Sequence, residues 1–541
     1  MIKKIFTENK FEFLIFVIIS ALMMSNFSNI YLWIDEGETV TLAKNIESGI
    51  PRYYDGKNLV LVMIQDANPD FIWTQSSWLH IYVTALSFSL LGFSTFNARL
   101  IFVIIGILAF FPIVVLFKKI SINKLHYYLS ILAVLFFVPY YLYSRQARYY
   151  ALLIFLMPII AISIYNLAFK NGSIVWFAIS FTLLFYSNHF SFFILMLTTS
   201  IYFIYIISKK TSKRKSLFKK LIISYIIIFF LTLPWAVYAD ISRLIKTNTG
   251  LAFQVIEKIY YILHSINSTI PILLIVSSTF FMLFFYFKKS ETIKKEKIFF
   301  SFFIGITPII ILLLPQYNDI RYLIGLFPLW ISFILLPIIF LIGKKEYISK
   351  IIGVAILLLF LFTNIFYSIS FYFFLPFENI LQEKCSSFIP EKSDYCDSWI
   401  KDTFISPREL KYPFFYYLYE ITHDYDGPIE GVVTYLKLEG DENSVVFTNN
   451  WASVIAFYTN MKVLKDPEYM NTDLTPDFIV ANFPTRRDIQ ETNYLVTYAE
   501  TRNYTKVTLP YPDLPWENRP TMWYHKFWTQ PVEVPVTIYV K

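Results

Sequence analysis

Acidic and basic residues stand beside long apolar runs at widely separated points of this 541-residue chain. Asp35 and Glu36 follow the first apolar run, and Arg99 begins a later one. The segment 144–148, Ser-Arg-Gln-Ala-Arg, interrupts an apolar hairpin, and Arg321 precedes another run. Carboxylates can act as general bases, and guanidinium groups bind phosphate oxygens bidentately. Brought together, these residue types could process a substrate that carries a phosphate.

Each candidate also has an ordinary structural explanation. Acids at a helix end often mark a solvated boundary, arginines near a membrane surface can extend to the headgroups, and a lone histidine is more often hydrogen-bonded than catalytic. The functional interpretation depends on the basic residues sharing one face with Asp35. The basic candidates are Arg99, Arg145, Arg148, His189 and Arg321.

The chemistry that fits such a site is transfer of a group from a lipid phosphate. Negative charge develops on the departing phosphate, and a preorganised guanidinium stabilises it. The acceptor hydroxyl needs a base, and the carboxylate of Asp35 can supply one. Glycosidases use a second carboxyl group to protonate a poor leaving group. A phosphate leaves without that help, so one acid and a basic cluster suffice.

The composition is that of an integral membrane protein. Hydrophobic residues make up 56% of the chain and charged residues only 16%, whereas soluble domains carry about 25% charged residues. From residue 11 to 376 the charges separate apolar runs, and roughly 20 apolar residues span a bilayer as a helix. We therefore predict a transmembrane domain over 1–376 and a soluble α/β domain over 377–541.

The distribution of Lys and Arg predicts the topology. The net charge of +8 is concentrated in short loops such as 209–220, 288–297 and 344–350, which is typical of cytoplasmic loops and argues against a nucleic-acid partner. The first helix, over 11–30, starts in the cytoplasm and is not a cleaved signal peptide. About eleven crossings follow if 78–91 lies at the outer interface or re-enters, and about thirteen if another helix precedes it.

Either odd count places the carboxy-terminal domain outside the plasma (inner) membrane, together with the long first loop 33–97 and the candidate residues. In the exported part, 444–448, 462–464 and 477–481 are predicted strands and 451–458 a helix. Cys385 and Cys396 are the only cysteines, and an oxidising compartment allows them to form a disulfide. Two unpaired thiols are the alternative. No pattern of metal ligands is present.

The ordered set resembles GT-C membrane glycosyltransferases. The resemblance is closest to the protein O-mannosyltransferase and lipid A aminoarabinose transferase superfamily (glycosyltransferase family 39-like). The residues that carry it are Asp35-Glu36 in the first outer loop, Asn97-Ala-Arg99 at a helix start, the hairpin 144–148, Arg321-Tyr-Leu before an apolar helix, and the exported segment 444–464. Each motif is short, and it is their order along nearly the whole chain that is specific.

The resemblance implies a GT-C fold and inverting transfer of a monosaccharide from a polyprenyl-phosphate donor to an acceptor hydroxyl on a lipid, glycan or protein. It implies that Asp35 is the base with Glu36 in support, and that the basic candidates lie near the donor phosphate or the acceptor. Some GT-C enzymes use a divalent metal, but no second acidic motif here marks a site. A lipid A signature and lumenal repeat domains are not recognisable, so the sugar and the acceptor stay open.

Two other function classes are alternatives to the enzyme. A transporter or flippase of lipid-linked saccharides would place polar residues near the bilayer midplane and show repeat symmetry. Here the charges gather at one face, which favours the enzyme. A non-catalytic envelope assembly protein would be indifferent to replacement of Asp35.

Overall fold

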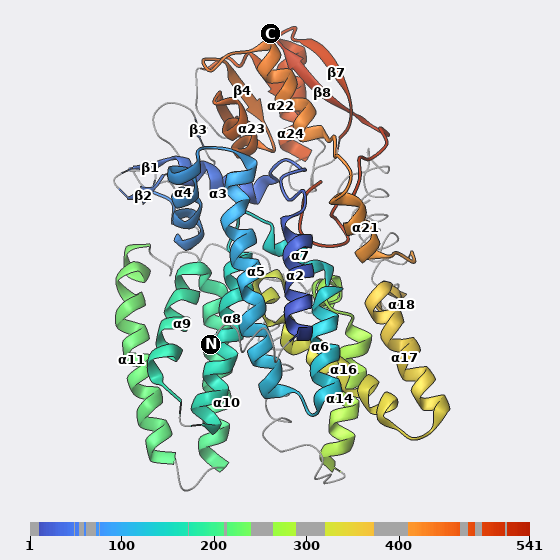
Figure 1. The fold of residues 1–541 in the computed structure, drawn as a ribbon. Helices are drawn as coiled ribbons and strands as arrows, with labels where there is room; N and C mark the ends of the chain where they lie inside the picture. Colours follow the sequence, from blue (N-terminus) through green and yellow to red (C-terminus); the bar gives the residue numbers. More distant parts are fainter. Residues whose placement is uncertain are drawn as a thin grey trace.

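A bundle of helices carries a smaller α/β unit at one end (Figure 1). The computed structural model describes residues 10–47, 49–52, 59–60, 72–74, 76–170, 172–209, 214–239, 263–287, 320–372, 409–465, 474–481, 489–513 and 517–541. The described helices of the bundle and its connections are α2 (Lys10–Met24), α3 (Ile34–Lys44), α4 (Leu79–Leu91), α5 (Thr95–Ile120), α6 (Lys124–Leu135), α7 (Val138–Ser144), α8 (Tyr150–Phe169), α9 (Ile174–Ser187), α10 (His189–Lys209), α11 (Arg214–Tyr238), α14 (Ile272–Phe287), η2 (Ile320–Leu326), α16 (Phe327–Gly343), α17 (Tyr347–Phe362) and α18 (Ile365–Tyr372).

The bundle is that of a polytopic membrane protein. Five of the described helices are long and apolar enough to cross a bilayer, or up to eight spans if each of three bent helix pairs is one span. Their outward side chains are apolar; Ile226, Phe229 and Phe230 of α11 are examples. Such a surface is stable in lipid and unfavourable in water. The predicted span over 298–314 lies outside the described residues, so the choice between eleven and thirteen crossings stays a prediction.

The first helix is shorter than predicted. It ends at Met24 instead of continuing to residue 30. Asn26 adopts a positive φ of 46°, the left-handed conformation that commonly terminates helices and that Asn tolerates better than most residues. A turn then leads into α3. Asp35 and Glu36 consequently lie in the first turn of a second helix rather than at the end of the first one.

The predicted interfacial segment 78–91 forms the short helix α4, which begins after Trp78. Figure 1 shows α4 beside α3, at the end of the bundle that carries the α/β unit. The Ser87 hydroxyl donates to the carbonyl of Asn97 at the start of α5, and the Tyr82 hydroxyl donates to the carbonyl of Gly49. Whether 78–91 lies at the outer interface or re-enters stays a prediction.

The strands and the helix predicted over 444–481 are present, within a sheet of six described strands in the order β3-β5-β4-β6-β8-β7. Its strands are β3 (Leu59–Val60), β4 (Val445–Thr448), β5 (Lys462–Lys465), β6 (Phe478–Val480), β7 (Thr505–Pro512) and β8 (Pro535–Val540). Strands β3, β5, β4 and β6 are parallel, whereas β8 is antiparallel to both its neighbours. Because β3 comes from the loop 33–97, the sheet draws on both predicted domains. That loop also contains the small hairpin β1 (Ile46–Glu47) and β2 (Ile50–Pro51).

Helices cover both faces of this sheet. The described helices of the unit are α21 (Pro413–Glu420), α22 (Pro428–Glu439), α23 (Ala452–Thr459) and α24 (Ile489–Thr501). Successive strand residues point to opposite faces: Val446 joins the main core with α22 and α23, and Phe447 packs with Leu495 and Ala499 of α24. The unit is a three-layer α/β/α sandwich.

Helix α3 is held by the α/β unit. A Cβ atom on Gly37 would lie 2.5 Å from Cγ2 of Val454, so only glycine permits this approach of α3 to α23. The Thr41 hydroxyl donates to the carbonyl of Ser453, and the Tyr458 hydroxyl accepts from the backbone N–H of Leu32. The helix that carries Asp35 therefore lies between the bundle and the sheet.

Candidate functional site

The two adjacent acids of α3 have different surroundings. The side chain of Asp35 is 25% exposed, whereas that of Glu36 is fully buried, at 0%. Consecutive residues of a 3.6-residue helix point about 100° apart, so one first turn can direct one carboxylate toward an opening and the next into the core. The predicted acidic pair is thus two separate groups with separate partners.

Glu36 and Arg99 form a buried ion pair. The Nε and NH2 groups of Arg99 donate to the two carboxylate oxygens over 2.8 and 2.7 Å, and the backbone N–H of Ala147 donates to Oε1 over 2.8 Å. Arg99 NH1 also donates to the carbonyls of Phe27 and Ile30. The pair joins α5, the turn before α3 and the 144–148 segment, and its charges neutralise each other.

Arg145 contacts the α/β unit. Its guanidinium lies 3.1 Å from Oε1 of Glu420 in α21 and 5.4 Å above the ring of Tyr417. Oε2 of Glu420 lies 2.7 Å from Nε2 of His525. Burial alone would raise the pKa of Glu420, but His525 and Arg145 outweigh burial, so the pKa lies below its ordinary value. This buried cluster joins the bundle to the α/β unit.

Arg148 and Arg321 flank Asp35 instead. NH1 of Arg321 lies 3.2 Å from Oδ2 of Asp35. NH1 of Arg148 donates to the backbone carbonyl of Asp35 over 3.0 Å and to the hydroxyl of Thr39 over 3.1 Å, and it also pairs with the Glu38 carboxylate. The first turn of α3 therefore has a guanidinium on its backbone and another on its exposed carboxylate.

Tyrosine rings support both guanidinium groups. Arg148 lies 5.4 Å from the ring centre of Tyr149, and Arg321 lies 5.3 Å from that of Tyr322. The two rings stack on each other, with centres 6.2 Å apart. Aromatic faces attract cations through the ring quadrupole. The stack thus fixes the two arginines beside Asp35 while leaving that carboxylate partly exposed.

Lys465 of the α/β unit acts on Glu38, which pairs with Arg148. Burial raises the pKa of Glu38, while Arg148 and the more distant Lys465 oppose that rise. Lys465 ends strand β5, so it comes from a part of the chain more than 400 residues away in sequence from α3. Positive charge consequently reaches this end of the bundle from three segments.

The histidines lie at the edge of the site. His189 stacks on Trp235 with ring centres 4.4 Å apart, and among the described residues none of its hydrogen bonds or ion pairs reaches Asp35, Arg148 or Arg321. His80 is fully buried and its ring centre lies 5.5 Å from that of Tyr149. Burial, with Arg148 and His189 nearby, holds the pKa of His80 well below its ordinary value, so its ring is neutral.

Several residues of this region were not candidates from the sequence. They are Glu38, His80, Tyr149, Tyr322 and Glu420. A signal existed for two of them, because the dipeptide Arg-Tyr occurs both at 148–149 and at 321–322, beside both arginines that contact Asp35. Glu420 carried no signal, since it lies in an ordinary aromatic stretch.

Cys385 and Cys396 lie outside the described residues, so the disulfide stays a prediction. Within the described ranges, no group of three or more His, Cys, Asp and Glu side chains is placed to hold a metal ion. The question of a divalent metal is therefore left to experiment.

The solved structures that this chain resembles include two of ArnT. No protein-family model matches the chain, and a search of curated proteins finds no match. ArnT from Cupriavidus metallidurans in the apo state superimposes with a TM-score of 0.48 and 10% identity, over 84% of this chain and 85% of that chain. ArnT from the same organism bound to undecaprenyl phosphate gives a TM-score of 0.47 and 10% identity, over 90% and 88% of the two chains. Each likeness covers more than four fifths of both chains.

Proposed function

We propose that this chain is an integral membrane glycosyltransferase that moves a monosaccharide from a polyprenyl-phosphate donor to an acceptor hydroxyl, with inversion. The proposal rests on one observation. The partly exposed carboxylate of Asp35 lies 3.2 Å from the guanidinium of Arg321, and Arg148 holds the backbone of the same residue. A base and phosphate-binding cations are thereby adjacent at one end of a membrane bundle. In this proposal the N-terminus is cytoplasmic and the α/β unit is extracytoplasmic.

The chemical step uses Asp35 as the base. The acceptor hydroxyl oxygen attacks the anomeric carbon of the donor, and its proton passes to the carboxylate. The bond between the anomeric carbon and the phosphate oxygen breaks, and its electron pair leaves with the polyprenyl phosphate. Arg321 compensates the charge that develops on that phosphate. Attack from the side opposite the leaving group inverts the anomeric centre.

The ion pair between Arg321 and Asp35 couples donor binding to the state of the base. Before the donor binds, Arg321 neutralises Asp35. The donor phosphodiester carries one negative charge, as the carboxylate does, and its two free oxygens accept a guanidinium bidentately, so it competes with Asp35 for Arg321. Binding of the donor then releases the base that the reaction needs.

The other candidates take supporting roles in this proposal. Arg99 and Glu36 are buried against each other and fix the start of α3, and Arg145 holds the α/β unit through Glu420. Arg148 positions Asp35 and adds positive charge, and His189 remains a candidate for contact with the donor. A protein that only assembles the envelope would not need Asp35 exposed beside two arginines.

The test is a turnover assay with the purified full-length chain in nanodiscs. A set of synthetic polyprenyl-phosphate monosaccharides is supplied, with and without a metal chelator, and sugar release or transfer is measured. Asp35→Asn is expected to abolish turnover. Glu12→Gln is the matched control. Glu12 of α2 is also outside the buried pair of Glu36 and Arg99, accepts a hydrogen bond from Tyr127 and faces Lys118 of α5, yet its replacement should leave turnover unchanged.

Each other outcome has a defined meaning. Equal turnover in Asp35→Asn and the unaltered chain would exclude Asp35 as the base. Donor binding without turnover would point to a missing acceptor. If no donor binds, the transporter or the assembly hypothesis replaces the enzyme.

A further inference from the structure

Among the described residues, helix α21 of the α/β unit and its surroundings leave several large apolar side chains exposed. We define the aromatic patch as Leu410, Tyr412, Phe415, Tyr419 and Trp528. These side chains are between 41 and 53% exposed, whereas Phe414 and Tyr417, on the other side of α21, are buried. Soluble surfaces rarely leave so many large apolar side chains together without a partner. The aromatic patch is therefore expected to contact an apolar partner.

The patch is one continuous surface although its residues come from two segments. The ring of Trp528 meets that of Tyr419 edge to face with centres 6.4 Å apart, and it meets that of Tyr416 in the same way at 5.1 Å. Phe415 stacks on Phe362, the last residue of α17, at 6.1 Å. The aromatic patch thus joins the apolar surface of a bundle helix.

Helix α17 fixes the position of the aromatic patch along the bundle, relative to the apolar surface of the spans. Helices α17 and α18 form one of the bent pairs that together are apolar enough to span a bilayer, and the exposed residues of α17 include Ile348, Ile351 and Leu358. At the bend, Asn364 accepts from the backbone N–H of Lys411 over 2.7 Å and donates to the carbonyl of Glu409 over 2.7 Å. The chain leading into α21 is therefore bound at the end of α17.

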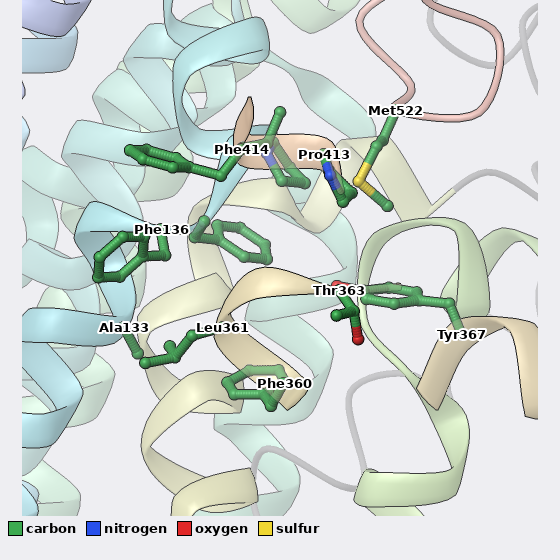
Figure 2. Close-up of a pocket in the computed structure, with 12 residues that line it drawn as sticks. Ala133, Phe136, Phe360, Leu361, Thr363, Tyr367, Pro413, Phe414 and Met522 are labelled. Atoms are coloured by element: carbon green, nitrogen blue, oxygen red, sulfur yellow. The ribbon is translucent and has the colours of Figure 1, made fainter. Parts of the chain in front are cut away.

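The buried side of α21 fixes its rotation. Figure 2 shows Pro413 and Phe414 beside an apolar pocket with Phe136, Thr363 and Tyr367. Phe136 and Thr363 lie at the bends of two helix pairs, 53° between α6 and α7 and 87° between α17 and α18. With its inner side held against these bends, α21 has no freedom to turn its outer aromatic side inward.

We propose that the aromatic patch lies in the headgroup region of the outer leaflet and docks the α/β unit on the lipid surface. Tyrosine and tryptophan favour this region because each combines an apolar ring with a polar group that reaches water. An amphipathic helix buries its apolar face at that boundary. The lipid-facing surface of α17 and the aromatic patch are continuous, so one bilayer covers both. This inference rests on the membrane fold and is independent of the proposed transferase activity.

The test measures the depth of Trp528 in a bilayer. The full chain is labelled with 5-fluorotryptophan and reconstituted at one copy per nanodisc, and Trp528→Phe assigns the fluorine resonance. Line broadening is compared between lipids that carry a nitroxide near the headgroup and a soluble paramagnetic chelate. Leu438→Trp supplies the reference for a water-exposed site. Leu438 of α22 is 77% exposed, and α22 belongs to the α/β unit, away from the bundle (Figure 1).

For Trp528, we expect a higher ratio of lipid-induced to chelate-induced broadening than for the Leu438→Trp reference. The double variant Phe415→Ser/Tyr419→Ser should lose much of that difference while the chain stays folded. A Trp528 ratio equal to the reference would overturn the proposal and leave the patch facing water. Protection of Trp528 from both reagents would overturn it too, because protein would then cover the patch.

Discussion

Replacing each acid of α3 by its amide should separate stability from activity. Glu36→Gln keeps the shape of the side chain but leaves the charge of Arg99 without its partner in a buried position. Asp35→Asn removes a pair whose two side chains are 25% and 21% exposed. The two variants change neighbouring residues by the same chemistry, so each is the control for the other.

The expected magnitudes differ several-fold. Removing one partner of a buried ion pair costs about 3–5 kcal/mol, because the remaining charge stays desolvated. A partly exposed pair contributes about 0–1 kcal/mol. Since native domains are stable by only about 5–15 kcal/mol, Glu36→Gln removes a large share of the free energy of unfolding. It also leaves the backbone N–H of Ala147 with a weaker acceptor.

The assay is thermal unfolding of the purified variants in one detergent, measured alongside donor turnover. Glu36→Gln should melt well below the unaltered chain, and the double variant Glu36→Gln/Arg99→Met should recover part of that loss. Asp35→Asn should melt close to the unaltered chain and be inactive.

Two results would refute this reasoning. If Glu36→Gln melts with the unaltered chain, the buried pair does not stabilise the start of α3. If Asp35→Asn melts as low as Glu36→Gln, its inactivity reports misfolding, and the role of Asp35 as a base loses its support.

Three further predictions follow from the same geometry. Arg321→Gln should lower turnover by roughly 10²–10³-fold, the usual effect of removing one charge-stabilising donor, and Arg321→Lys should recover only part because it cannot bind bidentately. Gly325→Ala should lower expression and turnover, since its Cβ would lie 2.1 Å from the Leu153 carbonyl oxygen and push η2 from α8, whereas Gly343→Ala, with nothing within 4 Å, should be silent. Burial raises the pKa of Glu517 to about 8 from 4.5; the folded chain therefore holds a proton that the unfolded chain releases, so stability falls as pH rises from about 4.5 to 8. Glu517→Gln should flatten that slope in melting curves recorded across this range, and an unchanged slope would exclude Glu517 as its source.

The sequence predicted the class of structure because its signals are long and regular. Apolar runs of bilayer length identified α5, α8 and α10, and the change of composition after residue 377 identified the α/β unit. The short strands at 445–448 and 462–465 were predictable because turn residues bound each of them. These features depend on local pattern alone.

The partners of the charged residues could not be predicted in the same way. The distribution of Lys and Arg predicted that four arginines share one face of the membrane. It could not reveal that Glu36 would neutralise Arg99 or that Glu420 would neutralise Arg145. Those pairs form between segments that are far apart in sequence and depend on how the helices bend. The first-helix boundary was missed because Asn26 ends α2 through its backbone conformation, within an otherwise apolar run.

The grip of the α/β unit on α3 also sets an order of events during biosynthesis. Domains generally fold as units from the N-terminus during synthesis, and α3 emerges among the first residues. The residues that hold α3 and the turn before it are synthesised much later. Asn518 donates to the carbonyl of Tyr31 over 3.0 Å, Tyr458 accepts from the backbone N–H of Leu32, and the carbonyl of Ser453 accepts from Thr41. A nascent chain that stops short of residue 453 therefore has Asp35 but none of these three contacts.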